Sequence, residues 1–154
     1  MTPAIKILEA SGCRFTLHLY ATNHGSSYGV SAAEKLALDP AQVFKTLVVA
    51  VIGQQPVIAL IPVSKQLHLK HLARCAGSKK AMLLSGSEAE KLTGYLVGGI
   101  CPIGLRKPLR VYADRSVTQF GNVFISGGKR GLELEISSKD LVSITNAVVS
   151  EIAD

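Results

Sequence analysis

The chain has 154 residues, of which 47% are hydrophobic and 18% are charged, and its formal net charge at pH 7 is +6. This composition excludes intrinsic disorder, and the longest apolar stretch, residues 47–52, is far shorter than the roughly 20 residues of a membrane helix. The length predicts a single domain over residues 1–154, with a core that needs no disulfide or metal. The positive charge is equally compatible with a polyanionic partner such as RNA and with a merely basic protein.

Neither the cysteines nor the N-terminus indicates export. Cys13, Cys75 and Cys101 are odd in number and widely spaced, which fits free thiols better than a metal site or a set of disulfides. Residues 1–6 lack the basic segment and apolar run that mark a secretory signal. We therefore expect a cytoplasmic location.

The first half of the chain predicts helices interspersed with strands. Thr2 is a capping residue before Pro3, and together they predict a helix that ends near Gly12. Residues 14–20 alternate between apolar and polar, which predicts a half-buried strand. The elements that follow are a polar loop over 23–29, a short helix over 32–37, and a hairpin of strands over 44–52 and 57–62.

The second half continues the mixture of helices and strands. The predicted elements are a helix over 67–76, a strand over 81–84, a helix from a capping box at Ser87 to Gly94, strands over 110–113, 123–126 and 132–136, and a helix from about Ser138. Strands joined by short turns favour an α+β fold with much antiparallel pairing over a doubly wound parallel sheet.

Lys45 is the first candidate for chemistry. On the predicted strand it shares a face with Leu47, Val49 and Val51, although lysine is rarely buried without a partner. Its side chain either extends to solvent from the strand end, which residue statistics alone favour, or places a cation at the rim of a pocket.

Residues 93–104 contain four glycines and a proline. Such a segment exposes backbone N–H groups and permits close approach of a ligand. The spacing matches neither a Walker loop nor a dinucleotide-binding fingerprint, so the alternatives are a structural turn and a pocket lining. Cys101 has no evident histidine partner in this segment and is expected to pack or line the pocket rather than act as a nucleophile.

Residues 123–136 predict a hairpin whose turn carries Lys129 and Arg130. Alternation places Leu132, Leu134 and Ile136 toward the core. Glu133 and Glu135 then share the other face, and Glu135 in particular is expected to be solvated. His68 and His71 lie three residues apart on a predicted helix but lack further ligands at a metal spacing, so surface histidines are expected.

Several of these segments together resemble the YbaK family, the free-standing relatives of the editing domain in bacterial prolyl-tRNA synthetases. The segments occur in the family's order and span almost the whole chain. They are residues 2–4, 44–47, 93–100, Pro102 with Gly104, and 126–132.

The resemblance implies a curved, mainly antiparallel mixed sheet, partly closed like a barrel, with surrounding helices. It implies a trans-editing deacylase that removes cysteine from mischarged tRNA(Pro), and also from tRNA(Cys), with the substrate's own thiol attacking the ester. It implies no cofactor and no metal, a mischarged tRNA as substrate, and prolyl-tRNA synthetase as a transient partner.

The resemblance also assigns candidate site residues. Lys45 is the functional lysine, and the substrate-binding residues are Tyr20, Tyr28, Thr46, Gly98, Gly99, Ile100, Cys101 and Glu133. Three positions depart from the common pattern: Cys101 replaces serine, Tyr28 replaces phenylalanine, and Glu133 replaces aspartate. Two alternatives stay open, namely a deacylase for alanyl- or seryl-tRNA and a non-catalytic module that binds tRNA or a synthetase.

Overall fold

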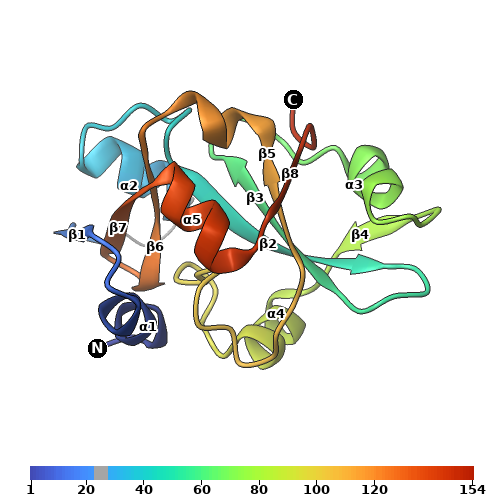
Figure 1. Cartoon of the computed structure of the whole chain (residues 1–154), viewed down its shortest axis with the longest axis horizontal. Helices are drawn as coiled ribbons and strands as arrows, with labels where there is room; N and C mark the ends of the chain where they lie inside the picture. The colour runs from blue at the N-terminus through green and yellow to red at the C-terminus, as the bar shows by residue number, and fades with distance from the viewer. Residues whose placement is uncertain (23–27) are drawn as a thin grey trace.

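The computed structural model describes residues 1–22 and 28–154, and of residues 28–31 it describes only the backbone. Its helices are α1 (Pro3–Ser11), α2 (Tyr28–Lys35), α3 (Leu69–Cys75), α4 (Gly86–Thr93), α5 (Ser138–Thr145) and the 3-10 helix η1 (Arg115–Gln119) (Figure 1). Its strands are β1 (Phe15–Leu19), β2 (Phe44–Val51), β3 (Val57–Pro62), β4 (Ala81–Leu83), β5 (Val111–Asp114), β6 (Asn122–Lys129), β7 (Leu132–Ser137) and β8 (Val148–Ser150).

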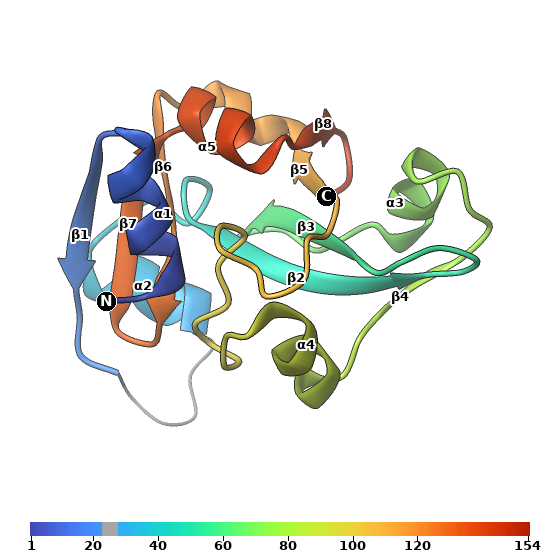
Figure 2. The same cartoon turned by 60° about the horizontal axis from the view of Figure 1, so that its bottom comes forward.

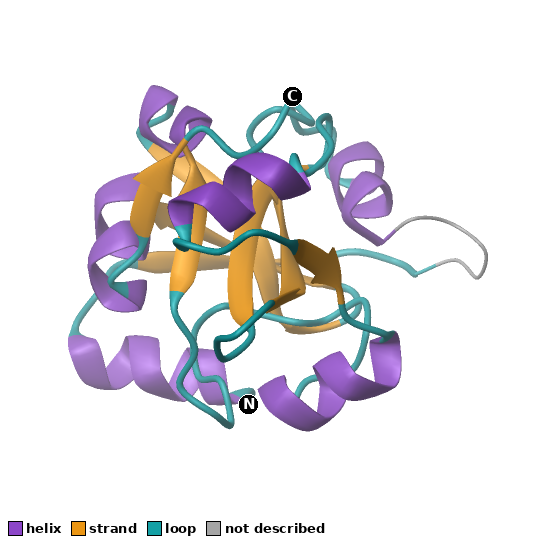
Figure 3. Ribbon diagram, turned by 90° about the vertical axis from the view of Figure 1, so that its right-hand side faces the viewer, coloured by secondary structure: helices purple, strands orange, loops and turns teal. Residues whose placement is uncertain are grey.

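The strands form two sheets with helices around them (Figure 3). The smaller sheet is antiparallel, in the order β1-β7-β6. The larger sheet has the order β4-β2-β3-β5-β8. In it, β2 pairs antiparallel with β3 and β4, whereas the pairs β3–β5 and β5–β8 are parallel.

The two sheets meet where β2 passes β6. A parallel backbone bridge joins Val43 to Phe124. The main hydrophobic core includes Val48 of β2, Ile125 of β6 and Leu8 of α1, and the course of these three elements can be followed in Figure 2. The predicted α+β fold with mainly antiparallel pairing is therefore confirmed. The sheets do not close into a complete barrel, because only this single bridge links them among the described residues.

Most predicted helix ends are confirmed. Thr2 caps α1 by accepting a hydrogen bond from the Ile5 N–H, and Gly12 ends the helix with a φ of 75°. The Thr2 hydroxyl also donates to the Gly127 carbonyl at 2.6 Å, which ties the start of α1 to strand β6. The predicted capping box of α4 was two residues too late. Ser85 is the cap, because its hydroxyl accepts from the Glu88 N–H.

Two other predictions about the first half differ from the structure. Helix α2 already includes Tyr28 and ends at Lys35, so the predicted helix over 32–37 began too late. Strand β1 lies at the edge of the smaller sheet, and Leu17 and Leu19 on its apolar face are 40% and 75% exposed. An edge strand has a neighbour on one side only, so alternation alone does not bury its apolar face.

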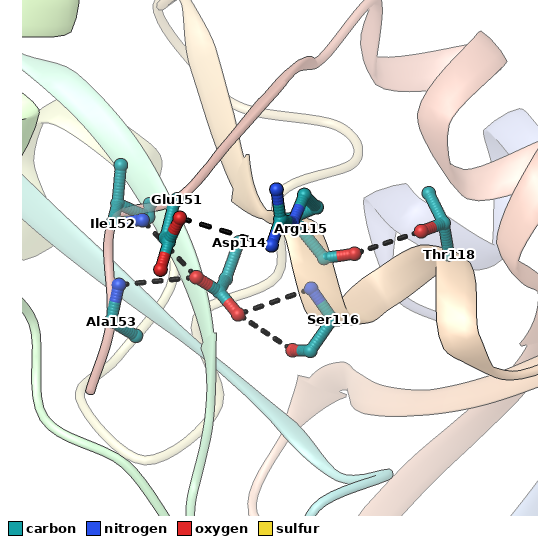
Figure 4. A network of polar contacts seen from close by, with 7 residues as sticks. All are labelled: Asp114, Arg115, Ser116, Thr118, Glu151, Ile152 and Ala153. Atoms are coloured by element: carbon teal, nitrogen blue, oxygen red, sulfur yellow. Dashed lines mark hydrogen bonds and ion pairs between the residues drawn. The ribbon is translucent and has the colours of Figure 1, made fainter.

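The C-terminal segment is attached to the larger sheet through Asp114 (Figure 4). The Asp114 carboxylate accepts hydrogen bonds from the Ser116 hydroxyl at 2.6 Å, from the Ser116 N–H, and from the N–H groups of Ile152 and Ala153, each of these three at 3.1 Å. Burial opposes its ionisation, but these hydrogen bonds hold the Asp114 pKa below its usual value. The carboxylate thus acts as a structural clamp.

Among the described residues, no helix combines the length and the apolar character needed to cross a membrane.

Candidate functional site

A cavity of about 350 Å³ lies where the two sheets approach each other. Its wall combines the start of β2, the start of α4 and the glycine-rich loop that follows α4, with Ser126 of β6, Glu133 of β7 and Tyr20 after β1. A second hollow, of about 640 Å³, lies between the ends of α1 and β7 and the start of α5, and none of the predicted site residues lines it.

The first cavity collects most of the predicted site residues. Six of them line it: Tyr20, Lys45, Thr46, Gly98, Ile100 and Glu133. Gly99 and Cys101 lie outside its lining, and the side chain of Tyr28 lies outside the described residues. Sequence reasoning missed Leu83, Val97 and Ser126. Ser126 had a usable signal, because the predicted hairpin places it opposite Glu133.

Lys45 and Thr46 line this cavity from neighbouring positions of β2. Lys45 is partly buried, and its ammonium group makes no hydrogen bond or ion pair within the described part of the chain. The Thr46 hydroxyl oxygen is buried and has no hydrogen-bond partner among the described residues. A buried hydroxyl without a partner costs stability.

Glu133 is the cavity's buried acid. In the register of the smaller sheet Glu133 lies opposite His18 of β1 and Ser126 of β6, and the residue is only 4% exposed. No hydrogen bond or ion pair from a described residue reaches its carboxyl group. Burial therefore raises the Glu133 pKa to about 8, because desolvation penalises the charged form. Burial is also the main cause of a raised Tyr20 pKa, and the charge of Glu133 is the second cause.

Glu135, two residues further along the same strand, shows the opposite behaviour. Its carboxylate lies 2.9 Å from His18 Nε2 and accepts a hydrogen bond from Asn122 at 3.1 Å. The hydrogen bond to His18 is the main reason why the Glu135 pKa falls below its usual value. The two glutamates share a strand face, but only Glu133 is buried in the cavity.

The glycine-rich loop is held between α4 and the β6–β7 turn. The Val97 N–H donates to the Glu90 carboxylate at 2.8 Å, and Arg130 Nε donates to the Val97 carbonyl at 3.1 Å. A Cβ atom on Gly99 would lie 2.6 Å from the Lys129 Cα, so Gly99 allows the two backbones to touch. Gly98 has a φ of 92°, which favours glycine.

This packing leaves backbone donors at the cavity wall. Gly98 and Ile100 both line the cavity, and their N–H groups donate no hydrogen bond within the described residues. Backbone N–H groups fixed in a loop can stabilise negative charge that develops on a bound carbonyl oxygen.

Cys101 is part of the hydrophobic core. It is fully buried, and desolvation raises its pKa to about 12. A thiol with this pKa stays protonated near neutral pH and is a poor nucleophile. Its burial therefore fits the expected packing role.

The residues that line the cavity thus carry an ammonium group, a buried carboxyl group, a hydroxyl and two backbone N–H groups. Among the described residues, no group of three or more His, Cys, Asp or Glu side chains could hold a metal ion.

Comparison with known proteins assigns a family to this arrangement. The pattern of the aminoacyl-tRNA editing domain matches residues 23–144. EbsC of Enterococcus faecalis, provisionally named a Cys-tRNA(Pro)/Cys-tRNA(Cys) deacylase, is 33% identical over 151 residues, covering 98% of this chain and 92% of that protein. Part of the proline–tRNA ligase of Streptococcus mutans is 27% identical over 99 residues, covering 64% of this chain and 16% of that enzyme.

Solved structures share the fold over the whole chain. The crystal structure of a hypothetical protein has a TM-score of 0.88 at 28% identity and covers 99% of both chains. A protein provisionally described as a trans-editing enzyme for prolyl-tRNA synthetase has a TM-score of 0.83 at 22% identity, covering 100% of this chain and 98% of that one.

Proposed function

Because this chain belongs to the aminoacyl-tRNA editing domain family, we propose that it is a trans-editing deacylase that removes cysteine from tRNA(Pro) and from tRNA(Cys). The observation that carries the proposal is the cavity lined by Lys45, Thr46, Gly98 and Glu133, whose polar groups have no partner among the described residues. The EbsC relative supports the choice of cysteine. The size of the cavity suits a small ligand such as the aminoacyl end of a tRNA.

In the proposed reaction the substrate supplies the nucleophile. The cysteine thiol sulfur bonds to the ester carbonyl carbon, the bond from that carbon to the ribose oxygen breaks, and the thiol proton ends on this oxygen. The products are a thiolactone and free tRNA. A nucleophile held beside its electrophile can lower the barrier by roughly 7–11 kcal/mol, so the protein needs mainly to hold the reactive geometry.

The cavity residues divide this work. Lys45 holds the terminal phosphate, the ribose or the carbonyl oxygen through its ammonium group, and the Thr46 hydroxyl adds a neutral hydrogen bond. The N–H groups of Gly98 and Ile100 face the oxygen that becomes negative as the thiol attacks. The buried thiol of Cys101 takes no part.

Prolyl-tRNA synthetase is the proposed transient partner. Proline–tRNA ligases contain segments similar to this chain, which supports action on the same tRNA. A chain with a net charge of +6 also suits phosphate contacts with the acceptor end.

The test is a set of mischarged tRNAs. The purified protein should release cysteine from tRNA(Pro) and tRNA(Cys). It should cleave the S-methylcysteine ester, which cannot cyclise, at least tenfold more slowly. Equal cleavage of the blocked ester would contradict attack by the substrate thiol. Preferential release of alanine or serine would transfer the assignment to those substrates, and tRNA binding without turnover would make the chain a binding module.

Lys45→Ala should reduce cysteine release at least 100-fold, because loss of a charged contact to bound substrate costs about 3 kcal/mol. Circular dichroism should show an unchanged fold, since the Lys45 ammonium group has no partner among the described residues. Unchanged release by this variant would remove Lys45 from the site.

A further inference from the structure

Glu133 is the cavity group that the proposed deacylation leaves unused. Its carboxyl is buried, lines the same cavity as Lys45, and lacks a hydrogen-bond or ion-pair partner among the described residues. Lys45 does not serve as that partner, because its nitrogen and the Glu133 oxygens do not come within 4.0 Å. A carboxylate in such a place is costly unless a cation compensates it.

Without a cation nearby the Glu133 carboxyl is protonated near pH 7, and a cation carried by the ligand would favour its ionised form. At the 3′ end of an aminoacyl-tRNA the phosphates are negative, and the ribose hydroxyls, the adenine and the side chains of cysteine, alanine and serine are neutral at pH 7. The α-ammonium group of the amino acid is the positive charge that remains. It lies one atom from the ester carbonyl, so a cavity that holds the carbonyl also surrounds this group.

We infer that Glu133 binds the α-ammonium group of the aminoacyl ester, and that the cavity thereby selects esters with a free amino group over esters whose amino group is acylated. The inference rests on the proposed deacylation. It means that peptidyl-tRNA and other N-acylated tRNAs are poor substrates, whichever side chain the ester carries. The amine held at Glu133 and the ester held near Lys45 would fix the orientation of the substrate in the cavity.

The neighbouring strand position provides a matched control. Glu135 has the same side chain and lies on the same face of β7, but it is paired with His18 and Asn122 outside the cavity. Glu135→Gln should leave the choice between free and acylated amines unchanged. Glu133→Asp keeps the charge and should keep the preference, whereas Glu133→Gln removes the charge at nearly constant volume.

The experiment compares kcat/KM for cysteinyl-tRNA(Pro) and its N-acetyl derivative. The wild-type protein should disfavour the acetylated ester by about 30-fold or more, the range expected for loss of one partner of a buried charged pair. Glu133→Gln should lose a similar factor on the free amine and little on the acetylated ester. Equal cleavage of both esters by the wild-type protein, or equal loss on both esters in Glu133→Gln, would overturn the inference. If the acetylated ester is excluded only by its size, Glu133→Gln would keep the full preference for the free amine, and this result would also overturn the inference.

A binding measurement separates this inference from the proposed reaction. The probes are an adenosine that carries cysteine through a stable 3′-amide, and the same compound without the α-amino group. In isothermal titration calorimetry, the wild-type protein should bind the probe without the amine at least tenfold more weakly than the probe with it. The Glu133→Gln variant should bind the two probes with similar affinity. If this pattern appears without turnover of any ester, the inference holds and the deacylase proposal fails. If esters are cleaved and the two probes bind alike, only the inference fails.

Discussion

Replacing Glu133 by glutamine should make the protein more stable, by an amount that grows with pH. The folded protein holds the Glu133 proton up to a pKa of about 8, whereas an exposed glutamate loses it near 4.5. Between these values the folded state binds the proton and the unfolded state does not, so the stability of the wild-type protein falls as pH rises. Glutamine cannot ionise, and the variant escapes this loss.

The magnitude follows from the two pKa values. Each pH unit between them changes the free energy of unfolding by about 1.4 kcal/mol, so the advantage of Glu133→Gln should grow by up to about 4 kcal/mol from pH 5 to pH 8. At pH 5 the two proteins should be nearly equal. The other ionisable groups at the cavity, including Lys45, are common to both proteins, and the raised pKa values keep Tyr20 and Cys101 uncharged over this range.

Urea denaturation at pH 5, 6, 7 and 8 measures the difference. Circular dichroism is the suitable signal, because the chain contains no tryptophan. Glu135→Gln is the control with the opposite sign. The pKa of the Glu135 carboxyl is lowered in the folded protein, so the carboxylate stabilises the wild-type protein at pH values above the unfolded pKa. Glu135→Gln should therefore be the less stable protein at pH 8.

A difference between Glu133→Gln and the wild-type protein that stays constant from pH 5 to pH 8 would refute the reasoning. It would mean that the carboxyl titrates as in water and is therefore solvated. The expected result, together with reduced activity, would identify a group that is retained for binding although it lowers stability.

Three other substitutions test the surroundings of the site. Asp114→Ala should cost about 3 kcal/mol by leaving buried donors unpaired, and the stabilising effect of the wild-type carboxylate should disappear in thermal melts as pH falls through its lowered pKa. Gly99→Ala should cost about 1–3 kcal/mol and slow deacylation, because its Cβ meets the Lys129 backbone at 2.6 Å, whereas Gly121→Ala, with no atom within 4 Å, should be neutral in both assays. Thr46→Val should be neutral or stabilising in urea denaturation and should reduce deacylation; unchanged deacylation would exclude its hydroxyl from substrate binding.

Local sequence determined most of the secondary structure. Capping residues, glycines after helices and alternation in the strands gave α1, the β2–β3 hairpin and the β6–β7 hairpin, because these depend on hydrogen bonds between near neighbours in the chain. At the start of α4 the pattern selected Ser87 as the cap, whereas the structure uses Ser85.

The site residues were identified from the resemblance to a family, and the sequence alone could not assemble them. Tyr20, Lys45, Gly98 and Glu133 come from four separate segments, and nothing local indicates that the two sheets meet at β2 and β6. The same limit separates Gly98, which lines the cavity, from Gly99, which faces the Lys129 backbone.

The clearest division between the two levels is on β7. Alternation determined that Glu133 and Glu135 share a strand face, because successive side chains point to opposite sides of a sheet. Only the tertiary structure decided that Glu133 is buried at the cavity without a partner among the described residues, while Glu135 reaches His18 and Asn122. Burial depends on what the rest of the chain places over a surface, and residue spacing carries no information about that cover.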